Sequence, residues 1–498
     1  MLGSTPRMRR VPFGFLVITL GPVLALAPVG GLAAQAPAAA PRPMTFMDMQ
    51  LMKQAGSAVP SPDGRFMVYT VSYPDWKEAK RQTDIFHVSL QQGLASTKRL
   101  TFTEDKNEGF LRWSRDGSFF AFLSNRDAPN NGSQNQVYIM RPDGGEARKV
   151  TDAKDGVSNL EFSRDGRWLV YRAGKSGEEQ LYRLRVSGID EAEPEQLTKQ
   201  AAGVGQWQLT HDSRRIYFIT ADTVDADEKQ RREKKFTVTV VNPETPLSSL
   251  YALDLDRVAV TRLTSDQAMT VTGFTISRDD RWVGFRGTSA DRYRRGTTEQ
   301  GIHTDLYLLE VATGGIERLT NNEEVGESGP AFSPDGRWIA FVAPDDLERY
   351  SMKNRRVYLR AVADRGGEWR KLGESHDGDV SIDFWSPDGR TVYFMDGVRA
   401  TTQLHALDVE RNTVRQVTKE LAQQQVNYDE DSGRYFINYA DPKTPPTLYT
   451  AASLDQLGSR RSWKQVYDVN PELRALALGE ERRSAGGRRT AAPWAASW

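Results

Sequence analysis

The sequence contains no cysteine and only five histidines among its 498 residues. Without cysteine the chain has no disulfide, no thiolate nucleophile, no zinc–thiolate site and no N-terminal cysteine for lipid attachment. The histidines are spread along the chain, at His87, His211, His303, His376 and His405, which leaves little room for a multi-histidine metal centre. We therefore expect neither a metal nor a cofactor.

The chain also lacks an excess of charge of either sign. Its 66 Lys and Arg balance 66 Asp and Glu, whereas a nucleic-acid-binding protein needs a basic surplus or stripe to neutralise phosphates. Hydrophobic residues make up 38% and charged residues 27%, and the mean hydropathy is −0.58. These values describe a water-soluble folded chain with a large core, and they exclude a nucleic-acid binder and a polytopic membrane protein.

The N-terminus has the order of a secretory signal peptide. Three arginines between positions 7 and 10 precede an apolar run at 11–27, and small residues follow. Cleavage is expected after Ala34 or Ala36. The alternative, an uncut membrane anchor, is disfavoured by the prolines and glycines within the run. We therefore predict a signal peptide at 1–36, a periplasmic or secreted protein, and no stable membrane insertion after cleavage.

A linker with one short helix is expected at 37–56. The stretch to Pro43 is rich in alanine and proline, which is typical of a flexible segment. Thr45 and Asp48 have the spacing of a capping box, and Phe46 recurs with later methionines at helical spacing.

From residue 57 the chain repeats a turn motif eight times. Three copies have the full pattern aromatic-Ser-Xaa-Asp-Gly-Arg followed by an apolar run, as in Phe332-Ser-Pro-Asp-Gly-Arg337. Three more differ from it at one or two positions, and the two remaining copies are weaker. Taken at the serine or its equivalent, the copies begin at residues 61, 114, 163, 210, 277, 333, 386 and 430. The copies recur about every fifty residues, and a repeat of this length indicates a toroidal array rather than independent domains.

Each copy is expected to form one blade of a β-propeller. Proline and glycine in the motif favour a chain reversal, and the flanking aromatic and β-branched residues favour strands. A second strand pair follows in most copies, as at 306–311 and 316–320, which makes four antiparallel strands per repeat. We predict an all-β chain with a propeller at 57–470, with eight blades favoured and seven possible because the last copy is degenerate.

These motifs resemble the propeller of the prolyl oligopeptidase family of serine peptidases, particularly its dipeptidyl-peptidase and acylaminoacyl-peptidase branches. The resemblance covers residues 44–480 and includes the segment from Ser61 with Thr83-Asp-Ile-Phe86, and the segment 469–480, which is similar to the family's link to its hydrolase domain. The blades also resemble the periplasmic propeller TolB, so the turn motifs alone do not choose between the two.

The resemblance implies that the catalytic residues belong to an α/β-hydrolase domain. From residue 471 only 28 residues remain, and the chain has no Gly-Xaa-Ser-Xaa-Gly elbow. The nearest approach, at 326–330, ends in proline. We therefore assign no catalytic, cofactor or metal residues, and expect a truncated linker and disordered tail at 471–498, either out-of-frame sequence or a genuine flexible end.

Other chemical signals are weak. The acidic stretch 377–383 lacks the glycine of a calcium loop and is expected to be an interblade loop. Gly174-Lys-Ser176 is expected to be a hairpin turn, and Asn131-Gly-Ser133 is either a glycosylation acceptor or a turn. His87 and His405 are expected to be packed or edge strand residues. The pairs Glu178-Glu179 and Glu323-Glu324 can hold an ammonium group, although solvated glutamates are the favoured interpretation.

The longest variable segments are expected on a single face of the disc. They connect second and third strands, at 72–84, 124–135, 222–235, 287–304 and 343–356. Loops on a rigid scaffold commonly bind ligands, so we expect peptides or a protein partner on this face. Three functions remain open: the substrate-gating propeller of an exported peptidase, inactive alone; a stand-alone TolB-like binding propeller; and an enzyme with a site in the channel, such as a glycosidase.

Overall fold

The computed structural model describes residues 41–129, 132, 134–223, 226–236, 246–264, 269–290, 302–322, 325–346, 353–479, 483–487 and 493–497. Residues 42–498 form one compact unit, to which the description below applies. The predicted signal peptide lies outside the described residues.

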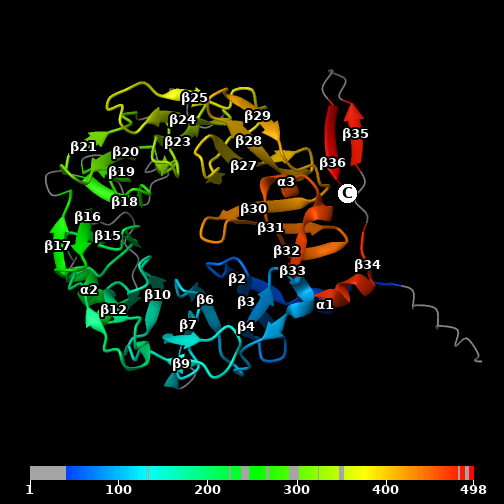
Figure 1. The fold of residues 1–498 in the computed structure, drawn as a ribbon, viewed down its shortest axis with the longest axis horizontal. Coiled ribbons are helices and arrows are strands. Elements are labelled where there is room, and N and C mark those ends of the chain that lie inside the picture. Colours follow the sequence, from blue (N-terminus) through cyan, green and yellow to red (C-terminus); the bar gives the residue numbers. More distant parts are fainter. Residues whose placement is uncertain are drawn as a thin grey trace, which may run out of the picture. The chain divides into compact units, whose positions relative to one another are not determined.

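Eight four-stranded antiparallel sheets follow one another along the chain and are arranged in a ring (Figure 1). The first four blades contain β2 (Gln54–Pro60), β3 (Phe66–Asp75), β4 (Lys80–Ser89), β5 (Lys98–Arg99); β6 (Glu108–Trp113), β7 (Phe120–Ser124), β8 (Gln136–Met140), β9 (Arg148–Lys149); β10 (Val157–Phe162), β11 (Trp168–Ala173), β12 (Gln180–Arg185), β13 (Glu195–Gln196); β14 (Trp207–Leu209), β15 (Arg215–Ala221), β16 (Ser248–Asp254) and β17 (Ala259–Arg262). The last four contain β18 (Met269–Ile276), β19 (Trp282–Ser289), β20 (Asp305–Glu310), β21 (Ile316–Arg318); β22 (Ala331–Phe332), β23 (Trp338–Pro344), β24 (Arg355–Ala361), β25 (Arg370–Leu372); β26 (Phe384–Trp385), β27 (Thr391–Val398), β28 (Thr401–Asp408), β29 (Thr413–Gln416); β30 (Gln423–Asp429), β31 (Arg434–Asp441), β32 (Thr444–Ala451) and β33 (Lys464–Tyr467). The all-β class and the eight-blade ring are confirmed, and seven blades are ruled out.

The repeated motif forms the turn between the first and second strands of each blade. In the sixth blade the Ser333 hydroxyl donates to Asp335 at 2.6 Å and accepts from the Trp338 N–H at 2.9 Å. Gly336 has a φ of 72°, a left-handed conformation that glycine adopts without strain. Two blades lack this glycine, and there Ser213 and Asp280 adopt φ values of 59° and 57°. The turn is therefore held by side-chain hydrogen bonds as well as by glycine.

The core consists of eight apolar clusters, one between each pair of neighbouring blades. In seven blades a stacked ring pair joins the second and third strands, as Phe341 and Tyr358 do with centroids 5.1 Å apart. His405 occupies this position in the seventh blade, where it stacks on Phe394. The expectation that His405 is a packed histidine is confirmed.

The ring closes through side chains rather than through an exchanged strand. The first blade consists of β2 to β5 and the last of β30 to β33, so each blade comes from one continuous segment. Residues from both, including Tyr69 and Tyr467, form a shared apolar cluster. Outside the blades, β1 (Arg42–Pro43) pairs in parallel with β34 (Leu476–Ala477), which joins the segment before the first blade to the segment after the last.

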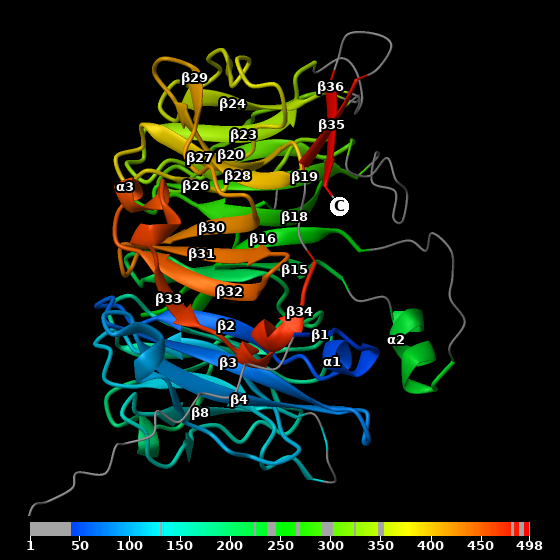
Figure 2. The ribbon, with the colours of Figure 1, turned by 90° about the vertical axis from the view of Figure 1, so that its right-hand side faces the viewer.

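The two sides of the ring carry different connections. Because the strands are antiparallel, the turn motifs lie on one side, here called the turn face, and the connections between second and third strands lie on the other, the loop face. Figure 2 shows α2 (Ala226–Glu233), α1 (Phe46–Gln50) and β34 on the loop face, opposite α3 (Leu454–Leu457). The predicted insertion at 222–235 is therefore confirmed between β15 and β16, although its helix was not predicted.

The short N-terminal helix begins as predicted. The Asp48 N–H donates to the Thr45 hydroxyl, and the Thr45 N–H donates to the Asp48 carboxylate, which completes the capping box.

Near the other end, β35 (Arg483–Gly487) pairs with β36 (Pro493–Ser497), a pairing that the sequence did not predict. The domain limits expected from the sequence stay predictions.

Candidate binding site at the channel mouth

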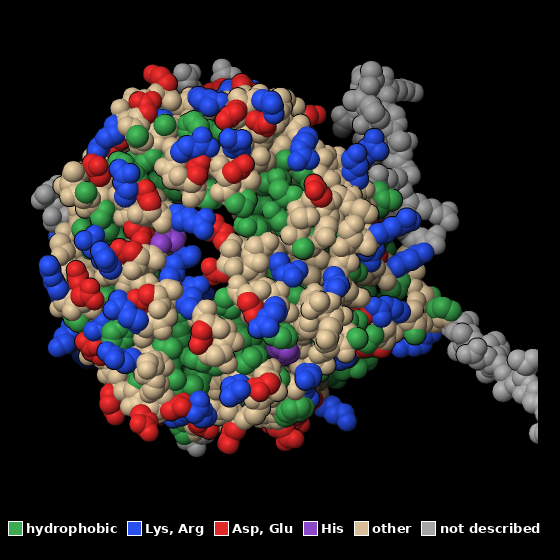
Figure 3. Space-filling view, in the orientation of Figure 1, with side chains coloured by type: hydrophobic (Ala, Val, Ile, Leu, Met, Phe, Trp, Pro, Cys, Tyr) green, Lys and Arg blue, Asp and Glu red, His purple; other side chains and the backbone are tan. Residues whose placement is uncertain are grey.

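The second residue of each turn motif differs from blade to blade. Its charged members lie around the turn-face mouth of the central channel. In chain order these residues are Pro62, Arg115, Arg164, His211, Arg278, Pro334, Pro387 and Asp431. Four consecutive blades therefore contribute three arginines and one histidine. Figure 3 views this face and shows a central hollow rimmed by Lys and Arg, with acidic side chains among them.

The turn of the last blade reaches across this mouth. Figure 1 shows the loop after β30 extending toward the middle of the ring. Its Asp431 accepts a hydrogen bond from Arg115 at 2.7 Å and lies 3.6 Å from Arg164, and its Glu430 lies 3.8 Å from Arg278. These pairs join the eighth blade to the second, third and fifth. The acidic turn therefore supplies the counter-charges of the arginines opposite it.

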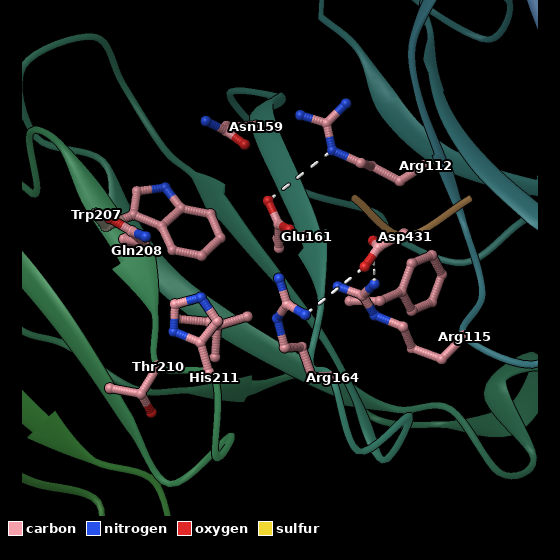
Figure 4. A pocket seen from close by; sticks show the side chains of 12 residues that line it. Arg112, Arg115, Asn159, Glu161, Arg164, Trp207, Gln208, Thr210, His211 and Asp431 are labelled. Atoms are coloured by element: carbon pink, nitrogen blue, oxygen red, sulfur yellow. Dashed lines mark hydrogen bonds and ion pairs between the residues drawn. The ribbon is translucent and has the colours of Figure 1, made fainter. Parts of the chain in front are cut away.

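A cavity of about 270 Å³ lies at this place in the channel wall (Figure 4). Its lining comes from the first strands and turns of three successive blades, together with Asp431: Arg112, Arg115, Asn159, Glu161, Phe162, Arg164, Trp207, Gln208, Leu209, Thr210 and His211. Figure 4 shows Arg115 and Arg164 directed at Asp431, and Glu161 facing Arg112. Glu161 lies 3.9 Å from Arg112.

Glu161 is partly buried and lies near three arginines. Burial raises the pKa of its carboxyl group, and the nearby charges of Arg112, Arg115 and Arg164 oppose this rise. Two donors in the same cavity have no acceptor: the buried Nε of Arg115 and the buried Nε1 of Trp207. The cavity thus has positively charged side chains and an aromatic wall.

His211 is fixed by the neighbouring blade. Its Nδ1 lies 3.0 Å from the Asp280 carboxylate, which also accepts from the N–H groups of His211 and Asp212. Burial opposes ionisation of Asp280, but the hydrogen bonds from the ring and backbone of His211 outweigh it and lower the pKa of Asp280. This pair therefore braces two adjacent turns.

The cavity contains no group arranged for nucleophilic catalysis. Thr210 carries the only hydroxyl in its lining, and that hydroxyl donates to Asp212 and accepts from the Arg215 N–H. Among the residues that the structure describes, no three His, Asp or Glu side chains are grouped as metal ligands. Chemically, the site is suited to binding an anion.

A second cavity, of about 320 Å³, adjoins the first through His211. Asp383 and Tyr428 lie in its wall, and burial raises the pKa of both side chains. The Asp383 carboxylate accepts a hydrogen bond from the Met395 N–H at 2.7 Å. Its carboxylate is therefore engaged with backbone.

The glutamate pairs named from the sequence are not free ammonium sites where they are described. Glu178 lies on the loop face, 3.1 Å from Lys229 and 4.0 Å from Lys175. Its hydrogen bond with Lys229 lowers the pKa of the carboxyl group. Glu179 accepts from the Gly177 N–H. Residues 323 and 324 lie outside the described residues.

The other weak signals fall where they were expected. The stretch 377–383 lies between β25 and β26, and Gly174 begins the turn between β11 and β12. The near-elbow at 326–330 is an interblade connection before β22, and His87 is a buried residue of β4. Asn131 and Ser133 lie outside the described residues.

The arginines of the mouth were missed from the sequence, although a signal for them was present. Aligning the eight turns places Arg115, Arg164 and Arg278 in one column with Asp431. The charge pattern of that column is visible without a structure. That Asp431 lies across the channel from the arginines is visible only in three dimensions.

No family model matches the chain. Among curated proteins, it is 23% identical to dipeptidyl-peptidase 5 of Porphyromonas gingivalis over 365 residues, which is 72% of this chain and 47% of that protein. It is 24% identical to dipeptidyl-peptidase 5 of Porphyromonas endodontalis over 76% of this chain and 49% of that protein. The chain thus spans about half the length of the curated relatives it matches.

Among solved structures, dipeptidyl peptidase 4 of Porphyromonas gingivalis superposes with a TM-score of 0.60 at 11% identity, over 92% of this chain and 67% of that one. None of the helices in the described ranges is long and apolar enough to cross a membrane. The chain is an eight-bladed propeller that resembles the peptidase propellers of the prolyl oligopeptidase family and is homologous to about half of the dipeptidyl-peptidase 5 chain.

Proposed function

We propose that the chain is the substrate-gating propeller of an exported serine peptidase of the prolyl oligopeptidase family, and that it hydrolyses no peptide by itself. The observation that carries this proposal is the similarity to dipeptidyl-peptidase 5 over more than 70% of the chain. The absence of a Gly-Xaa-Ser-Xaa-Gly elbow from the sequence supports the second part. The basic and apolar N-terminus supports export.

The partner of the loop face is a peptidase domain in this proposal. The segment before the first blade and the segment after the last blade meet there, at β1 and β34. Large apolar side chains are exposed beside them: Phe46 is 58% exposed, Met49 51% and Trp76 51%. The rings of Phe46 and Trp76 contact each other, with centroids 5.7 Å apart. A cluster of exposed apolar residues on a water-soluble protein is typical of an interaction surface.

Site-specific cross-linking tests this partner, because a chain without cysteine accepts a single reactive thiol. Met49→Cys places the thiol on the loop face, and Arg411→Cys, at a side chain 81% exposed between β28 and β29, places it on the turn face as the control. In the native cell envelope, we expect Met49→Cys to cross-link to a fluorophosphonate-labelled serine hydrolase and Arg411→Cys not to.

Equal cross-linking from both positions, or labelled hydrolase at neither, contradicts the proposal. A stable loop-face adduct with a protein that is not a hydrolase favours the TolB-like alternative.

Export is tested separately by mass spectrometry of the native protein, which is expected to begin at residue 35 or 37. A cytoplasmic protein that begins at Met1 contradicts export.

A further inference from the structure

The turn-face cavity has more hydrogen-bond donors than its own acceptors satisfy. Arg115 uses one nitrogen for Asp431, while its Nε and the Nε1 of Trp207 are buried without partners. Buried donors in folded proteins nearly always have an acceptor. These two nitrogens are closed to solvent, whereas the guanidinium of Arg164, with its side chain 39% exposed and 3.6 Å from Asp431, is open to a ligand.

A ligand can replace Asp431 in its ion pairs with Arg115 and Arg164. The side chain of Asp431 is 43% exposed, that of Arg164 is 39% exposed and that of Arg115 is 24% exposed. Ion pairs between exposed groups contribute little, because water already solvates both partners. Asp431 also belongs to the degenerate turn, which reaches the arginines from across the channel. The Asp431 carboxylate thus occupies the position that the carboxylate of a ligand would take.

The geometry points to a carboxylate-binding site formed by Arg115 and Arg164, in which Asp431 is the resting occupant and a peptide carboxylate is the ligand. Arginine presents paired N–H groups that match a carboxylate. Phe162 and Trp207 form apolar wall beside the two arginines, so the carboxylate is one that stands next to an apolar side chain. A cavity of about 270 Å³ has room for the end of a peptide and not for a folded partner.

This inference is independent of the proposed function. The cavity lies on the turn face, whereas the proposed peptidase partner lies on the loop face, and ligand binding there needs no hydrolase. Failure of the loop-face cross-link therefore leaves the inference standing, and failure of ligand binding leaves the cross-link standing.

The test is binding of small peptides to the full 498-residue chain by calorimetry. The probes are N-acetyl-glycyl-phenylalanine with a free carboxylate, the same compound amidated, and N-acetyl-phenylalanyl-glutamate amide, whose only carboxylate is on a side chain. We expect the free acid to bind at least about tenfold more tightly than its amide. Binding of the glutamate probe decides whether side-chain carboxylates are accepted too. Binding should weaken as salt is added.

Matched variants assign the effect to residues. Arg115→Gln and Arg164→Gln should each abolish the preference for the free acid. Asp431→Asn keeps the shape of the resting occupant and removes its charge, so it should raise affinity for the free acid about two- to fivefold. That gain cannot come from misfolding. Arg278→Gln, at the same turn position but outside the lining of this cavity, is the control for the general positive charge of the mouth, and it should weaken binding far less than Arg115→Gln does.

Two results overturn the inference. One is equal affinity for the acid and its amide, or no binding of either carboxylate probe even by Asp431→Asn. The other is an equal loss from Arg278→Gln and Arg115→Gln, because this would show a diffuse positive field at the mouth rather than a site.

Discussion

At the residue scale, one turn backbone serves two purposes. In seven of the eight motifs the first and third residues, such as Ser114 and Asp116, hold the turn through side-chain hydrogen bonds, and in the eighth Asp429 and Ser432 do so. The second residue makes no such bond in the turn and is therefore free to vary from proline to arginine, histidine or aspartate. The scaffold positions are constrained by backbone chemistry, and the intervening position sets the charge of the channel mouth.

The buried hydroxyl of Ser114 is predicted to stabilise its blade. It donates to Asp116 at 2.7 Å and accepts from the Phe119 N–H at 3.2 Å. Ser114→Ala leaves that N–H without its acceptor and should lower the free energy of unfolding by about 1–2 kcal/mol. Ser118→Ala is the control in the same turn, because Ser118 is exposed. Urea unfolding measures both; equal effects would refute the role of the buried hydrogen bond.

Glu327 is predicted to make stability depend on pH. Burial raises the pKa of its carboxyl group to about 7, from an ordinary value of 4.5. The folded state holds the proton of Glu327 more tightly than the unfolded state does. The contribution of Glu327 to the free energy of unfolding is therefore complete below pH 4.5 and is lost as the pH rises through 7. The loss should amount to about 3 kcal/mol.

Glu327→Gln should remove this dependence, since the amide stays neutral at every pH. Unfolding free energies at pH 5 and pH 8 should then differ less in the variant than in the parent chain. Glu410→Gln, an exposed control, should behave like the parent chain. A pH response unchanged in Glu327→Gln would contradict the assignment.

At the scale of elements, Asn470 joins the two ends of the propeller. It is 3% exposed; its Oδ1 accepts from the Lys53 N–H at 2.9 Å, and its Nδ2 donates to the Lys53 carbonyl at 2.9 Å. This side chain mimics one rung of a sheet ladder between the segment before β2 and the segment after β33.

Asn470→Ala is predicted to loosen the junction without unfolding the blades. Amide hydrogen exchange should accelerate in residues 42–56 and 471–477, while β15 and β16 of the fourth blade exchange as before. Glu472→Ala, which removes only the 3.2 Å contact between Glu472 and Lys53, is the milder control. Faster exchange throughout the ring, or none at the ends, would contradict the local role.

Local elements could be predicted from the sequence to the extent that their determinants are local. The capping box at Thr45 and the eight turns follow from short-range hydrogen bonds and glycine conformation, and both were predicted. The helix at 226–233 was not, because its charged residues have the composition of a solvated insertion. The contact of Asp431 with Arg115 joins residues 316 positions apart, and no local pattern encodes such proximity.

At the scale of the whole molecule, the two faces of the ring differ in chemical character. The loop face bears the exposed Phe46, Met49 and Trp76 and the pairing of β1 with β34, and the turn face bears the arginine-lined mouth. Eight interblade clusters hold the ring, and no strand is exchanged between the first and last blades. Under the proposed function, a ring with a charged mouth on one face and exposed apolar residues on the other would admit peptides to a separate catalytic domain.

Under the proposed function, this chain serves a peptidase without carrying the catalytic residues itself. The most direct measurement is to incubate the purified 498-residue chain with chromogenic dipeptide and acyl-amino-acid substrates and with a fluorophosphonate probe. The account predicts no hydrolysis and no labelled serine under conditions in which the peptide probes above bind. Hydrolysis by the chain that fluorophosphonate abolishes, with a labelled serine in one of its blades, would contradict it.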